Sequence, residues 1–204
     1  MTSRNGSIFA APWQPVLDFW FEDGLDQGWP SANLNGRWFR ATPEIDAGIR
    51  ERFGALVEAA CNNELVEWEA TPLSRLALIV LLDQFTRHCY RDTAAAYQGD
   101  HRAVTLALEG LARGFDRELP WVGRIFLLLP LMHAEDLDLQ QQCVARYQHW
   151  HDSAPAEIQT KIASHLGAAR RYCDIIERFE RFPHRNAILG RESTAEELAF
   201  LQAQ

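Results

Sequence analysis

The sequence predicts an all-α fold, and three observations point to it. Apolar residues recur every three or four positions along most of the chain, which is the spacing of one face of an α-helix. Two of these runs follow a helix start signal, since Thr42-Pro43 and Thr71-Pro72 each place a capping hydroxyl before a proline in the first turn. Strand signals are thin, because the alternation over Val66–Glu69 is short and has no second run to pair with.

The first half of the chain predicts three helices. A short one should begin at Pro15, and the connection 22–41 after it is long enough to be either packed by its aromatic residues or functional. The run 45–60 has one apolar face, which is typical of a helix on the surface of a core. The run 71–85 is apolar nearly all round, so this helix should be buried at the centre.

The second half predicts the remaining helices and brings the expected number to seven or eight. They should run from a cap at Asp100 to a stop at Gly114, from Pro120 to a kink or end at Pro130, over 139–150, over 158–179 before Pro183, and after a capping box at Ser193 and Glu196. Short links between most of these helices favour antiparallel neighbours, so we expect stacked helical hairpins.

The composition is typical of a soluble domain. We expect residues 1–204 to form a single all-helical domain, with a loose segment over 1–11. The net charge of −8 argues against a nucleic-acid partner, which needs a basic face to neutralise phosphates. The apolar runs are far shorter than the roughly 20 residues of a membrane helix, so we expect no membrane partner.

The compartment is predicted from two further features. The N-terminal residues lack the apolar stretch of a secretory signal, and the four cysteines form no C-x-x-C pair. Each cysteine has apolar neighbours at helical spacing, which is typical of a buried free thiol. We therefore expect a cytoplasmic protein.

Polar residues interrupt the central apolar helix. Asp83, Arg87 and Tyr90 continue its apolar stripe, and side chains three or four positions apart on a helix can meet. A buried charge is costly unless it is paired. These residues form either an ion pair that holds helices in register or one wall of a polar pocket, in which Arg87 and Arg91 face an anion.

A second apolar helix ends in His133, Glu135 and Asp136. Histidine and carboxylates are the groups of acid–base and metal sites. Their spacing is not that of a zinc protease, and we assign no metal ligand. The alternative is structural, with Asp136 as the cap of the next helix, Glu135 at its positive end and His133 hydrogen-bonded at a helix end.

A third polar segment follows the last long helix, where a proline turns the chain and presents His184, Arg185 and Asn186. Six arginines lie between positions 170 and 191, which makes a local positive surface on an acidic protein. These basic groups either complement the negative end of the helix or, through His184 and Arg185, bind a carboxylate or phosphate.

These three segments resemble those of a known family. LLDQFTRHCYR is similar to the family motif LLDQFPRNIYR, segment 114–136 to a leucine-rich helix with a P-x-M-H-x-E-D ending, and segment 178–201 to an RFGRFPHRN motif. On these motifs the chain resembles the bacterial domain-of-unknown-function family DUF924. The resemblance implies a tetratricopeptide-like helical superhelix, and it brings no known activity, catalytic residue or cofactor.

The chain departs from the family pattern at four places. Thr86 stands where proline is usual, His88-Cys89 replaces Asn-Ile, and Glu180 stands where glycine is usual. Tyr172 stands where a histidine is common. This last change removes a possible proton carrier or ligand and weakens any catalytic interpretation that would use it.

Three functions are open on the sequence alone. The first is a helical binding module whose polar, arginine-containing groove takes a peptide or a small anionic ligand. The second is an enzyme, a hydrolase or transferase that uses His and carboxylate residues on a small anionic substrate. The third is a structural polar core with a role in forming a homo-oligomer. The candidate site for the first two comprises Asp83, Arg87, Tyr90, Arg91, His133, Glu135, Asp136, His184, Arg185 and Asn186.

Overall fold

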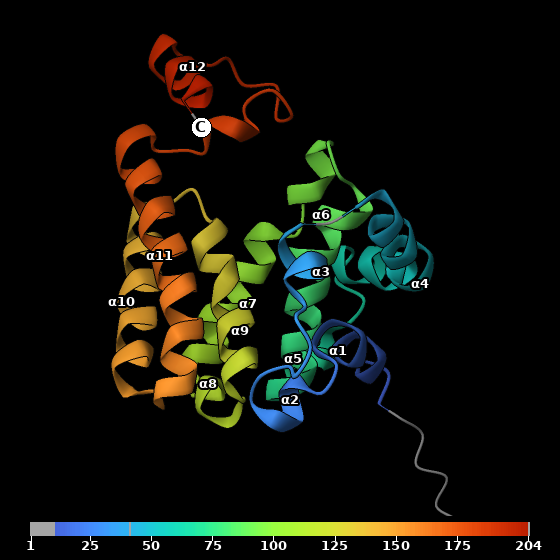
Figure 1. Cartoon of the computed structure of the whole chain (residues 1–204). Helices are drawn as coiled ribbons and strands as arrows, with labels where there is room; N and C mark the ends of the chain where they lie inside the picture. Colours follow the sequence, from blue (N-terminus) through green and yellow to red (C-terminus); the bar gives the residue numbers. More distant parts are fainter. Residues whose placement is uncertain (1–10, 41, 204) are drawn as a thin grey trace, which may run out of the picture.

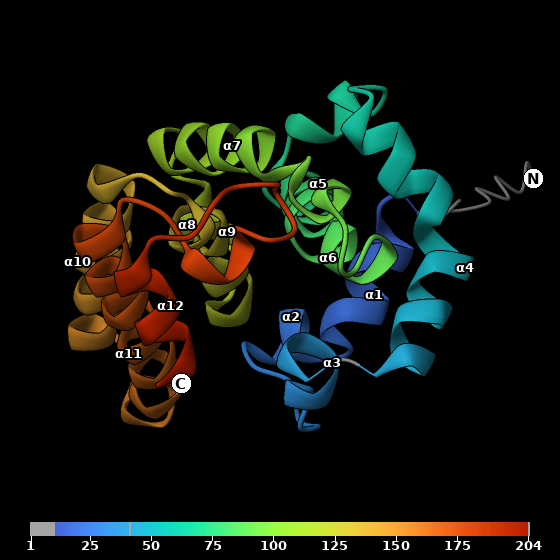
Figure 2. The ribbon, with the colours of Figure 1, turned by 90° about the horizontal axis from the view of Figure 1, so that it is seen from above.

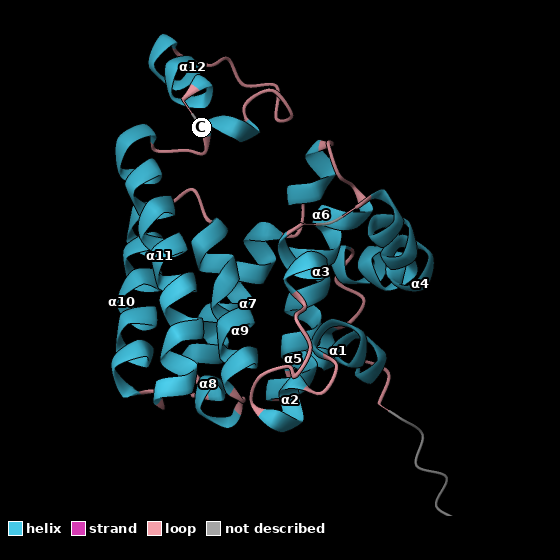
Figure 3. Cartoon of the chain, viewed as in Figure 1, coloured by secondary structure: helices cyan, strands magenta, loops and turns pink. Residues whose placement is uncertain are grey.

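The structure, a computed structural model, describes residues 11–40 and 42–203. In these ranges the chain forms helices joined by loops, without a strand, which confirms the all-α class (Figure 1, Figure 3). The expected loose segment lies, but for its last residue, outside the described residues.

The first half contains α1 (Gln14–Phe21), α2 (Gly24–Gln27), α3 (Asn35–Phe39), α4 (Pro43–Cys61), η1 (Val66–Glu69), α5 (Pro72–Ile79), η2 (Val80–Phe85), α6 (Thr86–Cys89) and η3 (Ala94–Tyr97). The second half contains α7 (Asp100–Ala112), α8 (Phe115–Glu118), α9 (Trp121–His133), α10 (Leu137–Ser153), α11 (Ala156–Phe179), η4 (Pro183–Arg185) and α12 (Ala195–Gln202).

The helical segments outnumber the seven or eight predicted. The connection 22–41 contains α2 and α3, and several other links hold a single helical turn. The alternation over Val66–Glu69 belongs to the 3-10 helix η1, in which the amide of Ala70 donates to the carbonyl of Glu67. In the described part of the chain, no helix is both long enough and apolar enough to cross a membrane.

Several helices begin at the capping side chains that the sequence predicts. The Thr42 hydroxyl accepts a hydrogen bond from the amide of Ile45, and Thr71 and Ser74 cap each other reciprocally. Asp136 caps α10 by accepting from the amide of Leu139. These bonds satisfy amides that have no partner inside the helix.

Two predicted helix starts are wrong. α7 begins at Asp100 itself, so this carboxylate is not the cap and is free to bind elsewhere. The last helix is capped by Thr194 and Glu197, one position after the predicted box, because Glu197 also pairs with Arg181 in this register. At Pro130 a kink or an end was predicted, and α9 does not end there but continues to His133, since packing against α5, α7 and α10 holds its apolar end in place.

The centre of the molecule is one helical rod made of α5, η2 and α6. Residues 74–86 are all buried, as the apolar sequence predicts. Its middle part, η2, is a π-helix, a local widening that is rare and often found at functional sites. Helices α1, α7 and α9 pack around α5, while α4 packs against η2 and α6.

The other half of the fold is a helical hairpin that covers α9. Helices α10 and α11 pack side by side, and both contact α9 (Figure 1). The chain after α11 turns back across the top of the molecule toward α9 and α6, as the view from above shows (Figure 2). This turn, η4, brings the third polar segment over the ends of the other two.

Gly99 allows α7 to begin directly against the π-helical part of the rod. A Cβ atom at this position would lie 2.3 Å from the carbonyl oxygen of Leu82. The close approach places Asp100, the next residue, beside the polar residues of the rod.

We predict that Gly99→Ala destabilises the protein by about 2 kcal/mol, because the backbones must move apart to make room. The matched control is Gly48→Ala in α4, where a Cβ would meet nothing within 4 Å. That change should leave stability unaltered or raise it by about 0.5–1 kcal/mol, since alanine favours helix. Urea denaturation measures both, and equal stability of Gly99→Ala and wild type would contradict the close packing.

Candidate functional site

Asp83 lies in the π-helical segment with its side chain completely buried. It accepts hydrogen bonds from Gln84 Nε2 at 2.5 Å and from His133 Nδ1 at 2.7 Å, and the guanidinium of Arg87 lies 3.3 Å away. Burial by itself would raise the pKa of Asp83, but His133 and Arg87 hold it well below its usual range. The carboxylate is therefore ionised at neutral pH.

The charge on Asp83 decides the state of the His133 ring. An ionised carboxylate can only accept, so the Nδ1 atom of His133 carries the proton of their hydrogen bond. In the neutral imidazole the other nitrogen, Nε2, is then an acceptor. His133 presents this nitrogen from the last residue of α9.

Arg87 joins two carboxylates. Its guanidinium binds both oxygens of Asp100, at 2.8 and 3.0 Å, in addition to its contact with Asp83. Asp100 comes from the first turn of α7, so this one side chain ties α7 to the central rod. The predicted Asp83–Arg87 pair is present, but Asp100 is its third member.

Arg185 is buried but incompletely paired. Its Nη2 donates to the backbone carbonyl of His133 at 3.0 Å, and its Nη1 reaches Asp100 only at 3.5 Å. Its buried Nε has no hydrogen-bond partner among the described residues. Burial and the nearby charge of Arg87 lower the pKa of Arg185 from its ordinary value. Its plane lies against the rings of Tyr97 and Phe182.

These side chains meet around one hollow of about 370 Å³, here named the arginine hollow. Its polar lining comprises Arg87, Arg91, Tyr97, His133, Tyr172, His184 and Arg185 together with one carboxylate, Asp92. The three polar segments of the sequence thus converge in space. Burial and the neighbouring Arg185 lower the pKa of His184, so this ring is neutral near pH 7.

Arg91 differs from its predicted role. Rather than facing an anion freely, it binds both oxygens of Asp46 on α4. Asp46 also bonds His88 Nδ1 at 2.8 Å, which makes a second Asp–His pair next to the first. Because the hydrogen bond from Arg91 lowers the pKa of Asp46, this carboxylate is also ionised.

Five predicted residues do not line the arginine hollow. Asp83 is completely buried and contacts the lining residues His133 and Arg87, and the other four have their partners elsewhere. Glu135 binds Arg191 through both oxygens and caps the amide of Phe182, on the far side of the turn. Asp136 is the cap of α10. Asn186 is buried and donates to Ser193, and Tyr90 packs against the hydrophobic core. Each of these four finds its partner nearby, so none of them is directed toward His133.

Four residues of the site escaped sequence reasoning. Asp100 was interpreted as a helix cap, and Tyr97 and Phe39 lie in segments without a pattern. Asp46 offered a signal, because this carboxylate lies at the edge of the apolar face of α4. Its partners, however, are His88 in α6 and Arg91 just after α6, and no spacing in the sequence indicates that they pair with Asp46.

A second hollow of about 690 Å³ lies between the α2–α3 segment and α11, here named the aromatic hollow. Its lining includes Trp29, Trp38, Phe39, Arg40, Lys161, His165 and Arg171. The sequence indicated the aromatic connection 22–41 as either a packing seam or a functional segment. In the described ranges, no cluster of three or more His, Cys, Asp or Glu side chains is suited to hold a metal ion.

We predict that Arg87→Met destabilises the protein by about 3 kcal/mol, because it leaves the buried Asp83 and Asp100 without their shared cation. Arg178→Met is the control, since Arg178 and its partner Glu196 are both exposed, and its cost should stay below about 1 kcal/mol. Chemical denaturation at pH 7 measures both. Equal effects of the two changes would show that the buried pairing does not hold the helices together.

The chain matches known proteins over nearly its whole length. The profile of a family described as a bacterial protein of unknown function (DUF924) matches residues 16–204. The fold is similar to the structure of a protein of unknown function, ATU0120, from Agrobacterium tumefaciens, with a TM-score of 0.78 and 36% identity. That match covers 94% of this chain and 97% of the other. No functionally curated protein matches the sequence.

The match extends over all three polar segments and confirms the resemblance that their motifs indicated. The chain belongs to the DUF924 family of bacterial proteins of unknown function.

Proposed function

We propose that the protein binds a small anionic ligand in the arginine hollow. The observation that carries this proposal is the incomplete pairing of Arg185, which is 6% exposed and has an unpartnered buried Nε. A buried guanidinium without a full set of acceptors is costly, and a bound carboxylate or phosphate would supply them. A peptide carboxylate is the other source of the same chemistry.

The surroundings of Arg185 support an anion rather than a neutral ligand. Arg87 and Arg91 line the same hollow, and their carboxylate partners lie behind them on η2, α7 and α4. The ring of Tyr97 lies against the guanidinium groups of both Arg87 and Arg185 and fixes their planes. A volume of about 370 Å³ suits a small molecule.

The proposal also covers the type of helical fold, the domain organisation and the compartment. We class the stacked hairpins as a tetratricopeptide-like superhelix within one domain, and we assign the protein to the bacterial cytoplasm. The adjoining helices α10 and α11 and the four free cysteines support these assignments. A homo-oligomer is compatible with the site, whereas a nucleic-acid partner does not suit the net charge of −8.

We predict saturable binding of inorganic phosphate, weakened by added salt, in titration calorimetry. Arg185→Lys keeps the charge but removes the planar fork, so affinity should fall at least about tenfold. Arg178→Lys, at an exposed position outside the hollow, is the control and should bind as wild type does. The proposal fails if phosphate does not bind at about 10 mM, or if Arg185→Lys binds it unchanged.

A second candidate function, hydrolysis, is favoured by the Asp83–His133 hydrogen bond. Asp83 fixes the proton on Nδ1, so Nε2 of His133 can take a proton from a water molecule. The water oxygen would then attack the phosphorus or carbonyl carbon of a bound ester. The ester bond to the leaving group would break, and His133 would return the proton to the departing oxygen.

This candidate predicts slow hydrolysis of p-nitrophenyl phosphate or p-nitrophenyl acetate above the buffer rate. His133→Gln should reduce the rate at least about a hundredfold, because the base that takes the proton from water is lost. His149→Gln, on α10 and away from the arginine hollow, is the control. Absence of hydrolysis with both esters, or full activity of His133→Gln, would leave binding as the function.

A further inference from the structure

The two hollows share one wall. Phe39, the last residue of α3, lines both the arginine hollow and the aromatic hollow. On the opposite side, Arg171 lines one hollow and its neighbour Tyr172 lines the other. The hollows therefore adjoin along α11, between Phe39 and the Arg171–Tyr172 pair.

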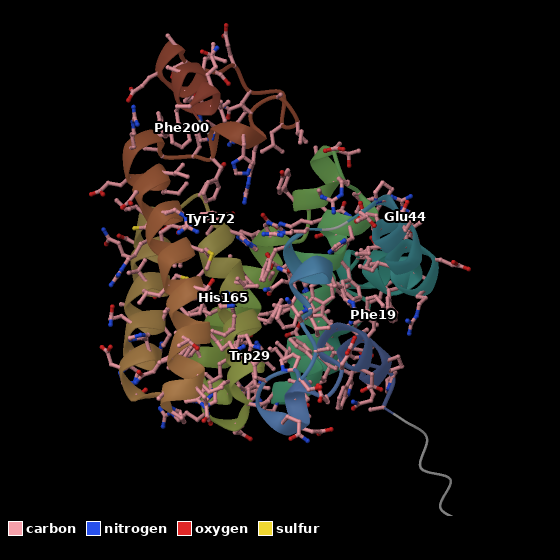
Figure 4. All side chains as sticks on the ribbon, in the orientation of Figure 1. Phe19, Trp29, Glu44, His165, Tyr172 and Phe200 are labelled. Atoms are coloured by element: carbon pink, nitrogen blue, oxygen red, sulfur yellow. The ribbon has the colours of Figure 1, made fainter. Side chains whose placement is uncertain are left out.

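One face of α11 runs along both hollows. Lys161, His165 and Tyr172 are four and seven positions apart, so their side chains leave the helix on the same side. Figure 4 shows His165 and Tyr172 one above the other on α11, with Trp29 below them. A ligand that follows this face would extend from the arginine hollow into the aromatic hollow.

The boundary between the hollows is an exposed aromatic ring. Phe39 is 53% exposed, and among the described residues it is the one aromatic side chain of the four large apolar side chains that are exposed. Its ring lies 5.9 Å from that of His165, which in turn lies 6.3 Å from the ring of Trp29. Because burial lowers the pKa of His165 to about 4, its ring is neutral at pH 7 and offers a flat, uncharged surface.

The aromatic hollow is also positively charged. Its lining contains Arg40, Lys161 and Arg171 and, among the described residues, no carboxylate. The arginine hollow differs, since carboxylates partner its arginines. In a protein of net charge −8, a hollow lined by three cations without an acid favours an anionic group.

We propose that the two hollows form one elongated site for a nucleoside phosphate. This inference rests on the proposed function, because the phosphate would lie at Arg185 and Arg87 as the small anion does. The planar base would lie against Phe39, since bases stack on aromatic side chains without requiring hydrogen bonds. A second phosphate on the same nucleoside would be attracted by Lys161 and Arg171.

Calorimetry with four probes tests the inference. The probes are inorganic phosphate, adenosine, adenosine 5′-monophosphate and adenosine 3′,5′-bisphosphate. We expect the monophosphate to bind at least about tenfold more tightly than inorganic phosphate, and the bisphosphate about tenfold more tightly again. Adenosine alone should bind more weakly than the monophosphate.

Two variants separate the parts of the site. Phe39→Leu keeps an apolar side chain but removes the ring, so it should bring the affinity for the monophosphate down to that for inorganic phosphate. Lys161→Met should abolish only the gain from the second phosphate. Val66→Ala is the control, because Val66 is 55% exposed and lines neither hollow.

The outcomes distinguish the two proposals. If inorganic phosphate binds but the nucleotides bind no more tightly, this inference is overturned and the anion site stands. If Phe39→Leu weakens phosphate and nucleotide equally, the ring does not contact a base and the inference is again overturned. If none of the probes binds, both proposals fail. A tetraglutamate peptide serves as a fifth, competing probe. If it binds more tightly than every nucleotide, the ligand is an acidic peptide and this inference is overturned.

Discussion

The buried negative charge of Asp83 is the constraint on which the candidate site depends. A carboxylate inside a helical core is stable only with hydrogen-bond donors and a positive charge beside it. Asp83 obtains them from Gln84 and Arg87 in the central rod and from His133 at the end of α9. Because η2 is π-helical, this part of the rod departs from regular α-helical geometry at the residue that carries the charge. Because Asp83 needs these partners, the end of α9, which carries His133, lies against the central rod.

Each partner of Asp83 brings a further group with it. Arg87 also binds Asp100, which fixes the start of α7, and the carbonyl of His133 binds Arg185, which fixes the turn after α11. Charges therefore accumulate where the ends of apolar helices meet, and the last one added, Arg185, has too few acceptors left. A site assembled in this way has fixed arginine planes and a histidine of fixed tautomer, which is the preorganisation that tight anion binding requires.

The sequence predicts the parts of this arrangement that depend on local pattern. Polar residues at the ends of Leu-rich helices indicated all three segments of the site, and Asp136 was indicated as a cap. The departure at Glu180 marks a real backbone feature, because this residue ends α11 with φ at 59°, a conformation that glycine adopts more easily. Pairings between distant elements could not be predicted. Asp46, Tyr97 and Asp100 come from three separate elements. Glu135 binds the guanidinium of Arg191, which lies beside it only in the folded chain.

The most direct test of this account is the tautomer of the His133 ring, measured by nitrogen-15 NMR of the histidine side chains in the intact protein at pH 7. An ionised Asp83 requires the proton of their hydrogen bond to lie on Nδ1 of His133. The account predicts a protonated Nδ1 in the His133 ring and the loss of this fixed proton position in Asp83→Asn. A His133 ring protonated only at Nε2 would show that Asp83 is a neutral acid, which would contradict the buried charge from which the site is derived.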